Sequence, residues 1–516
     1  MKPHHIFLFF AVTFSVNVVA QNESHSLTIN LSVDKSVQKE MKKSGRLFIF
    51  INQNPNVEPR RMMWPSAGSF IFAKNMSSLD ARKGAKLPGD GWSKTRQWDL
   101  SEIPDGEYYV QILWDQDKEE SRHDAPGNLY SEKQKVSITN NTEVEFVLSK
   151  VIEPRTIVKH ELVREIDIQS DTLSKWWGKP VHVKATILLP AGYKEGEKKE
   201  YPIRYNVAGY GGRYDRINYI VKENVRGESV RFLDWWTSDE APRIINVFLD
   251  GEGPFGDSYQ MDSENSGPYG YSLVYELIPA IEKKYRGTES PETFFVDGCS
   301  TGGWVSLGLQ LYYPDVFNGV FSYSPDAIEF ENYQLINIYK DKNAYTNEYG
   351  YTRPVMRETS GEPMMTLREF IQYENVLGSS DSYLNSGGQF SAHTALYSPK
   401  GKNGLPKPLF DPVTGEVDHT VAEHWKKYDF KIYCQENWKE LGPKLQGKIY
   451  VWMGDMDHFY LNLGTRAFDE FLKTTQDPVS DAKIEFSPTK GHCADYSNKR
   501  VLLQIKDRLK EISASK

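Results

Sequence analysis

The feature that most constrains the fold is an alternation of strand-like and helix-like segments that begins near residue 151. The strand-like runs are VHVKATILLP, YPIRYNVAGYGG, RIINVFLDGEG, TFFVDG, NGVFSYSPD, KIYVWMGDMD and AKIEFSP. The helix-like runs, with apolar residues at helical spacing, are YSLVYELIPAIEKKYR, GWVSLGLQLYYP, TRAFDEFLKT and SNKRVLLQIKDRLKEI. Such alternation predicts an α/β fold in which helices cover both faces of a mostly parallel sheet.

Residues 21–150 have a different pattern. The segments SLTINLSV, GRLFIFIN, EYYVQILWD and TEVEFVLS alternate apolar and polar residues, and turn residues separate them. This period of two predicts a small all-β sandwich domain over residues 21–150, followed by the α/β domain over 151–516. The change of pattern near residue 150 also indicates that the two domains are separable.

The α/β pattern is interrupted between about residues 328 and 445. This stretch is rich in aromatic residues and contains His393, His419 and His424. An insertion of this length in a compact domain is usually functional, so we expect it to form a lid or a substrate platform.

Residues 1–20 read as a cleavable signal peptide. Lys2 precedes the apolar run IFLFFAVTFSVNVVA, which ends in small residues, with Val18 and Ala20 at the positions that a signal peptidase would recognise. The run is too short for a comfortable membrane span. We therefore expect a secreted or periplasmic protein without a membrane span. The net charge of −8, with no cluster of Lys and Arg, argues against a nucleic-acid partner.

The segment VDGCSTGG, residues 296–303, places Ser300 between a strand-like and a helix-like run. A G-x-S-x-G sequence is a weak signal alone, but a strand before it and a helix after it are the context of a nucleophile elbow. Gly298 and Gly302 fit this turn because side chains there would collide. The turn would expose the serine hydroxyl at the end of the strand and aim a helix N-terminus at developing negative charge.

A serine needs a base to take its proton, and elbows of this kind follow the chain order Ser, acid, His. His458 and His492 are the histidines that fit this order. His492 follows the late strand AKIEFSP, where a loop can reach back to the serine, so we assign it as the base. Asp455 and Asp457 both follow the preceding strand, and spacing alone does not choose between them. The acid would orient the imidazole and stabilise its cation.

Several separated segments resemble one known family. ELIPAIEKKYR, GCSTGGWVSLGLQLYYPDVF, LYSPKGKNGLPKPLFDPVTG and GDMDHFYL are similar to esterases of the α/β-hydrolase fold, a group related to esterase D, feruloyl esterases and mycolyltransferases. The resemblance covers roughly residues 160–510 and implies Asp457 as the acid, because the family's acid lies three residues after the glycine. It also implies an oxyanion hole built from the N–H groups of Thr301 and Tyr210. The family's H-G-x-x-G loop reads AGYGG here, with Ala208 in place of the histidine.

A narrower resemblance concerns two of the three cysteines. Cys299 precedes the serine and Cys493 follows the histidine, which is similar to the bridged pair of tannases and some feruloyl esterases. If Ser300 and His492 interact, their neighbours Cys299 and Cys493 would fall within reach of a disulfide. We therefore expect a Cys299–Cys493 bridge that ties the histidine loop to the elbow, and Cys434 as a buried free thiol.

Together these observations predict an exported serine carboxylic-ester hydrolase that acts through Ser300, His492 and Asp457. No metal or organic cofactor is expected. The substrate would be a small-molecule or glycan-linked ester, and the aromatic residues of the chain are compatible with carbohydrate-linked or aromatic esters. Two alternatives stay open, an acyltransferase of the same fold and a glycan-binding protein on a non-catalytic hydrolase scaffold.

Overall fold

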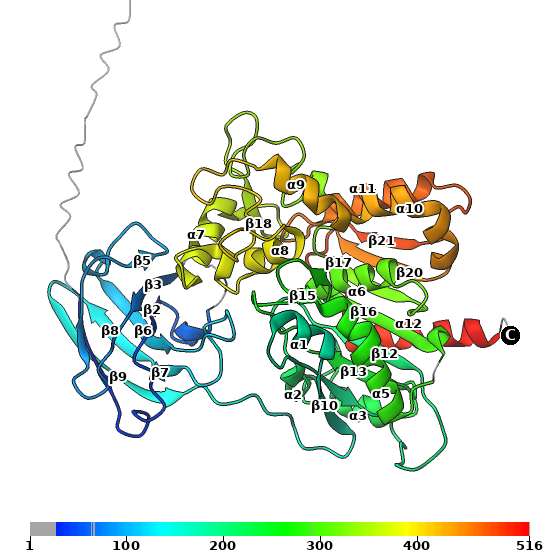
Figure 1. Cartoon of the computed structure of the whole chain (residues 1–516), viewed down its shortest axis with the longest axis horizontal. Helices are drawn as coiled ribbons and strands as arrows, with labels where there is room; N and C mark the ends of the chain where they lie inside the picture. Colours follow the sequence, from blue (N-terminus) through cyan, green and yellow to red (C-terminus); the bar gives the residue numbers. More distant parts are fainter. Residues whose placement is uncertain (1–26, 63, 65–67, 289, 515–516) are drawn as a thin grey trace, which may run out of the picture.

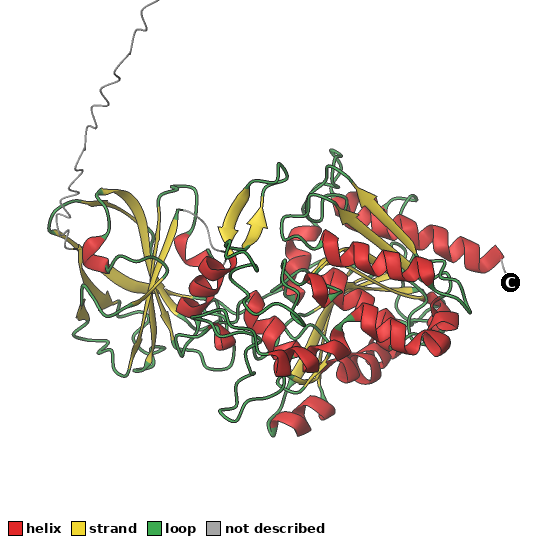
Figure 2. Cartoon of the chain, turned by 90° about the horizontal axis from the view of Figure 1, so that it is seen from above, coloured by secondary structure: helices red, strands yellow, loops and turns green. Residues whose placement is uncertain are grey.

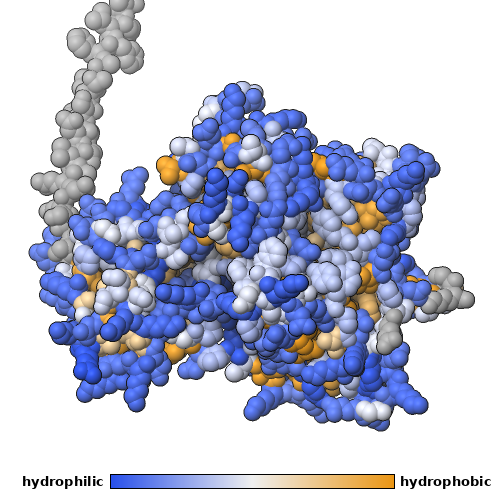
Figure 3. Space-filling view, viewed as in Figure 1, coloured by the Kyte–Doolittle hydropathy of each residue, from blue (hydrophilic) through white to orange (hydrophobic). Residues whose placement is uncertain are grey.

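The computed structural model describes residues 27–62, 64, 68–288 and 290–514, so the expected signal peptide lies outside the described residues. Figure 1 shows an all-β domain on one side, an α/β domain on the other, and most of the 328–445 stretch above and between them, whereas its last helix lies in the α/β domain. Hydrophilic residues cover most of the face seen in Figure 3. Within the described ranges, no helix combines the length and apolar character needed to cross a bilayer.

Nine strands among the described residues form the all-β domain, hereafter the sheet domain. They are β1 (Leu27–Val33), β2 (Gly45–Asn52), β3 (Ser69–Met76), β4 (Ala85–Leu87), β5 (Ser93–Lys94), β6 (Gly106–Asp115), β7 (Leu129–Ser131), β8 (Gln134–Ile138) and β9 (Thr142–Val151). The predicted all-β character is confirmed, and hydrogen bonds join these strands into one sheet, in the order β4-β1-β9-β7-β6-β2-β3-β5 with β8 on β6. One face of this sheet encloses the domain's own core.

Strand β2 is buried on both faces. Leu47 and Ile49 point into the core of the sheet domain, whereas Phe48 and Phe50 point to the opposite side and pack against the 328–445 stretch. Because side chains alternate along a strand, burial of both faces explains why GRLFIFIN is an almost continuous apolar run.

The α/β domain is built on eight strands. They are β10 (Val163–Gln169), β11 (His182–Leu188), β12 (Ile203–Val207), β13 (Ile245–Leu249), β16 (Phe294–Ser300), β17 (Val320–Pro325), β20 (Ile449–Gly454) and β21 (Lys483–Ser487). Their order is β10-β11-β13-β12-β16-β17-β20-β21. The pairs β10–β11 and β11–β13 are antiparallel and all the others are parallel. The predicted mostly parallel sheet is thus confirmed. One small antiparallel pair, β14 (Asp262–Ser263) with β15 (Gly267–Pro268), lies apart from this sheet.

Helices cover both faces of this sheet (Figure 2). They are α1 (Asp171–Trp177), α2 (Ile217–Ile220), α3 (Phe232–Thr237), α4 (Tyr269–Ser272), the π-helical turn Leu273–Leu277, α5 (Ile278–Tyr285), α6 (Thr301–Tyr312), α10 (Phe430–Leu445), α11 (Asn462–Thr474) and α12 (Asn498–Ala514). Adjacent residues of β17 show the two layers, because Ser322 donates to Gly303 O in α6 while Tyr323 donates to Gln504 in α12.

The stretch expected as an insertion leaves the sheet after β17. It contains β18 (Pro354–Arg357), β19 (Pro363–Thr366), α7 (Leu367–Leu377), α8 (Gln389–Tyr397) and α9 (His419–Trp425). Thr366 and Glu369 form a capping box that starts α7. Helix α10 contacts α6 and α11, so the chain has rejoined the α/β layers there. The part between β17 and α10 is called the cap below.

Candidate active site

The nucleophile elbow forms where β16 ends and α6 begins. Ser300 has φ 63° and ψ −128°. Residues other than glycine rarely adopt this backbone conformation, which is typical of strained functional sites. A Cβ atom on Gly298 would lie 2.6 Å from Val207 O, and one on Gly302 would lie 2.6 Å from Ala208 O. Both positions therefore require glycine because β12 passes so close to the turn.

The loop after β21 brings His492 to an acid that follows β20. His492 Nδ1 donates to Asp457 Oδ2 at 2.6 Å, and the N–H of Phe459 donates to the other oxygen of Asp457 at 2.9 Å. Asp455 instead forms a two-pronged ion pair with Arg466, at 2.6 and 2.7 Å. Of the two carboxylates that spacing left open, Asp457 is the one in contact with the histidine.

The charges around His492 make it a stronger base. Burial lowers the pKa of its imidazole, but attraction to Asp457, the hydrogen bond from Nδ1 and the charge of Asp326 together raise it above the ordinary histidine value. Its Nε2 atom is buried and has no hydrogen-bond partner among the described residues. The hydroxyl of Ser300 donates to Asp326 at 3.4 Å. The serine and His492 line the same cavity, but no hydrogen bond joins the two side chains directly. In enzymes without substrate such bonds are often long or unformed.

The predicted oxyanion donors flank the serine. Thr301 is the first residue of α6, and the first N–H groups of a helix have no acceptor within it. Tyr210 lies in the AGYGG loop after β12, where a Cβ on Gly209 would stand 3.8 Å from the Cβ of Ser300. The N–H of Gly211 donates to Asp257 at 3.0 Å, and the hydroxyl of Tyr210 donates to Gly387 O in the cap.

A disulfide joins Cys299 to Cys493 directly beside the serine and the histidine, with their Cα atoms 6.0 Å apart. The N–H of Cys493 donates to the hydroxyl of Ser324 at 3.1 Å, and Arg226 donates to Cys493 O at 3.0 Å. The histidine loop is therefore fixed to the elbow by a covalent bond and to its surroundings by hydrogen bonds. Cys434 is buried and unbridged.

A family model described as "Putative esterase" matches residues 180–498, which is more than half of the chain. The chain belongs to this esterase family. It is a carboxylic ester hydrolase, and the resemblance that the sequence motifs indicate is confirmed. A search of curated proteins found no match.

Solved structures similar to this esterase include a ferulic acid esterase, with 16% identity over 66% of this chain and 94% of that chain and a TM-score of 0.41. Another is an S-formylglutathione hydrolase from Agrobacterium tumefaciens, with 12% identity over 67% and 93% and a TM-score of 0.37. A third is a CE1 ferulic acid esterase from Anaeromyces mucronatus, with 13% identity over 68% and 92% and a TM-score of 0.33.

The sequence analysis missed Asp326, which follows β17 and is 3% exposed in the esterase. Its carboxylate accepts hydrogen bonds from Thr301 Oγ1 and Tyr259 OH, both at 2.8 Å, and His393 Nε2 lies 3.4 Å away. Burial raises the pKa of Asp326, but His393 and these hydrogen bonds outweigh burial and lower it. The sequence YSPD held a signal for Asp326, because it places an aspartate directly after a predicted strand. That strand, β17, lies next to β16, which carries Ser300.

The other two histidines of the cap lie away from the esterase's serine. His419 contacts Ile338 O, and His424 pairs with Glu264. Of the three histidines singled out in this stretch, His393 alone contacts the network around the elbow.

A cavity of about 530 Å³ opens above the elbow of the esterase. Ser300 and His492 line it, together with the aromatic residues Tyr210, Phe459 and Trp64. Trp64 belongs to the sheet domain, between β2 and β3, and nothing in its sequence context pointed to the active site.

Proposed function

We propose that Ser300, His492 and Asp457 form the catalytic triad of this esterase. The observation that carries the proposal is the 2.6 Å bond between His492 and a fully buried Asp457, in a cavity that His492 shares with the elbow serine. The raised pKa of His492 supports it, because a base must hold the proton it takes during the attack.

In the proposed reaction, Ser300 Oγ attacks the ester carbonyl carbon while His492 Nε2 takes the hydroxyl proton. The carbonyl oxygen becomes an oxyanion, which accepts hydrogen bonds from the N–H groups of Thr301 and Tyr210. When the intermediate collapses, the C–O bond to the alcohol breaks and His492 returns the proton to the leaving oxygen. Water then attacks the acyl-enzyme in the same way, and the acid and free serine are released. Each oxyanion donor contributes about 100- to 1000-fold in kcat.

We further propose that the esterase is exported and acts on aromatic or carbohydrate-linked esters. The disulfide beside the site supports export, since such bonds persist in oxidising compartments. The four aromatic side chains that line the cavity, those of Trp64, Tyr210, Phe459 and Tyr496, support a substrate with a ring, because aromatic pairs and sugar–ring stacking both need such surfaces.

The triad is tested by substitution and hydrolysis of p-nitrophenyl acetate. We expect Ser300→Ala and His492→Ala to remove nearly all turnover with an unchanged melting temperature. A fluorophosphonate probe, which reacts with activated serines, should label the wild type and not Ser300→Ala. Retention of most of kcat in either variant would refute the assignment.

The choice of acid has a matched control in the same loop. Asp457→Asn should lower kcat about ten-thousand-fold, as loss of a triad acid does elsewhere. Asp455→Asn should change kcat little, because Asp455 pairs with Arg466 and does not contact His492. A larger loss in Asp455→Asn would show that the acid is wrongly assigned.

A further inference from the structure

The sheet domain places an aromatic ring in the active-site cavity. The ring of Trp64 contacts those of Tyr210 at 6.2 Å, Phe459 at 6.0 Å and Phe370 at 5.6 Å between centroids. The Tyr210 and Phe370 contacts are edge-to-face, a favourable geometry for aromatic pairs. Trp64 remains 37% exposed, so a molecule in the cavity can reach its indole.

The partners of Trp64 are themselves parts of the site. Tyr210 lies in the loop that carries the proposed oxyanion donor, and Phe459 follows the acid Asp457 by two residues. The ring of Phe459 also makes an edge contact with the imidazole of His492, 5.0 Å between centroids. Trp64 therefore closes one wall of the cavity between the oxyanion side and the histidine side.

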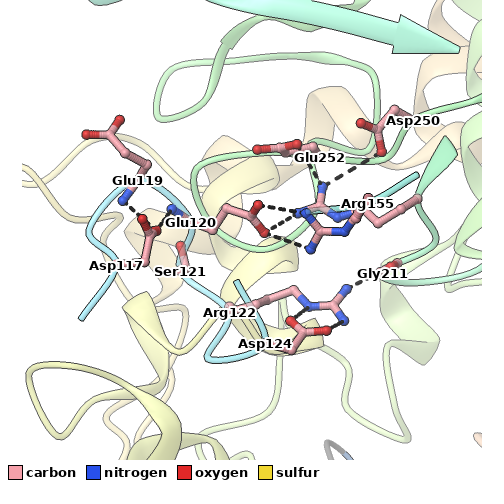
Figure 4. Close-up of polar contacts among 12 residues, drawn as sticks. Asp117, Glu119, Glu120, Ser121, Arg122, Asp124, Arg155, Gly211, Asp250 and Glu252 are labelled. Atoms are coloured by element: carbon pink, nitrogen blue, oxygen red, sulfur yellow. Dashed lines mark hydrogen bonds and ion pairs between the residues drawn. The ribbon is translucent and has the colours of Figure 1, made fainter. Parts of the chain in front are cut away.

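A second residue of the sheet domain holds the oxyanion loop. Arg122, between β6 and β7, donates from Nη1 to Gly211 O at 2.7 Å. Asp124 fixes the same guanidinium through bonds from Nε at 3.1 Å and from Nη2 at 2.9 Å (Figure 4). This bond holds the Gly211–Gly212 peptide, which lies two peptides after the one that carries the proposed donor N–H of Tyr210.

A nearly buried ion cluster anchors the Arg122 segment to the α/β domain. Glu120 accepts hydrogen bonds from Arg155 at 2.9 and 3.1 Å (Figure 4). It also accepts one from Arg213 at 2.7 Å. Arg213 stands at the end of the oxyanion loop and also lies 3.8 Å from Asp250. Charge-assisted bonds of this kind are short and directional, so the cluster fixes the distance between the two domains at this point.

We propose that the sheet domain is a working part of the active site. Trp64 determines specificity by contacting a ring-bearing group of the substrate, and Arg122 is a positioning residue that holds Gly211 so that the N–H of Tyr210 meets the oxyanion. The inference rests on the proposed esterase site. It opposes the separability that the change of sequence pattern suggested, because a chain that begins near residue 151 lacks both side chains.

The Trp64 half is tested with full-length Trp64→Ala on three esters. These are methyl acetate, without a ring, phenyl acetate, with a ring in the alcohol, and methyl 3-phenylpropanoate, with a ring in the acyl group. We expect KM to rise about tenfold for at least one ring-bearing ester, because one good aromatic contact is lost. For methyl acetate, which has no ring, kcat/KM should stay within about twofold of the wild-type value. Trp176→Ala is the matched control, since Trp176 is also exposed and lies outside the cavity.

The Arg122 half is tested by the split between kcat and KM. Arg122→Ala should lower kcat about tenfold or more for all three esters with KM nearly unchanged, since the oxyanion forms in each reaction. Arg122→Lys and added guanidinium should each restore part of kcat, which a merely structural defect would not allow. Lys118→Ala, an exposed cation of the same segment, serves as the control.

The outcomes distinguish failure of the proposed triad from failure of the proposed role of the sheet domain. If Ser300→Ala is inactive while Trp64→Ala and Arg122→Ala match the wild type, the site stands and the role of the sheet domain is refuted. Equal losses on every ester in Trp64→Ala would refute its role in specificity. If Trp64→Ala fails to fold, Trp64→Leu provides the same comparison.

Discussion

At the scale of single residues, the site contains two buried carboxylates with different partners. Asp457 accepts the Nδ1 proton of His492, whereas Asp326 accepts the hydroxyls of Thr301 and Tyr259 and the long bond from Ser300. Asp326 therefore fixes Thr301, the residue that carries one of the proposed oxyanion donors. Its negative charge also raises the pKa of His492.

This arrangement predicts a pH effect of Asp326→Asn. His492 must be neutral to accept a proton, so kcat/KM falls as pH drops through its pKa. Removing a negative charge that raises this pKa should lower it, and the acidic limb of the profile should move to lower pH. The measurement is kcat/KM for p-nitrophenyl acetate between about pH 5 and 9, where histidine titrates. Asp455→Asn should leave the limb in place, and an unmoved or upward-shifted limb in Asp326→Asn would contradict the role of Asp326.

At the scale of elements, the site depends on holding the loop after β21 against the β16–α6 turn. The two pieces are 194 residues apart in sequence, and the Cys299–Cys493 bridge joins them. Closing a loop of this length removes chain entropy from the unfolded state worth roughly 5 kcal/mol, an upper figure. The bridge also restricts the proposed base, His492, to the neighbourhood of the serine, which would preorganise the site.

Thiol titration tests the bridge. Cys434 is fully buried, and burial raises the pKa of its thiol, so the folded protein should show no reactive thiol. Unfolding without reductant should expose one thiol, and unfolding with reductant should expose three. Three thiols without reductant would rule out the bridge. Cys299→Ala with Cys493→Ala should lower both the melting temperature and kcat, whereas Cys434→Ala should leave kcat unchanged.

At the scale of the whole molecule, the sheet domain and the α/β domain share an apolar interface. Phe48 and Phe50 of β2, with Leu113 of β6, pack against Tyr373 and Val376 of α7, at the place where α7 meets the sheet domain in Figure 1. The ion cluster around Glu120, the Arg122–Gly211 bond, the Trp64 contacts and the ion pair of Arg46 with Asp381 join the two parts at further points.

We therefore expect one cooperative thermal unfolding transition. Val376→Asp should separate it into two or lower its midpoint markedly, because an uncompensated charge in a buried contact costs about 3–5 kcal/mol. Val413→Asp is the matched control, since Val413 is 72% exposed in the cap. The measurement is differential scanning calorimetry, and two transitions in the wild type would contradict the coupling.

The sequence predicts what depends on local signals. The apolar period predicts the parallel sheet, and the glycines around Ser300 predict the elbow, because each is determined by neighbours in the chain. Trp64 and Arg122 could not be found in this way, because they meet the site only through packing of distant segments. Strand β10 was missed because its sequence VREIDIQ carries charged residues on its exposed side.

The proposed site has a consequence for synthesis of the protein. Its parts are spread from Trp64 to His492, and the second follows the first by 428 positions (492 − 64). At about 5–20 residues per second, a ribosome needs on the order of 20–90 seconds to make the intervening chain. For the last 192 positions of this stretch (492 − 300), about 10–40 seconds, the nascent polypeptide holds the serine without its proposed base. On the proposed triad, an emerging chain therefore has no esterase activity until translation is almost finished.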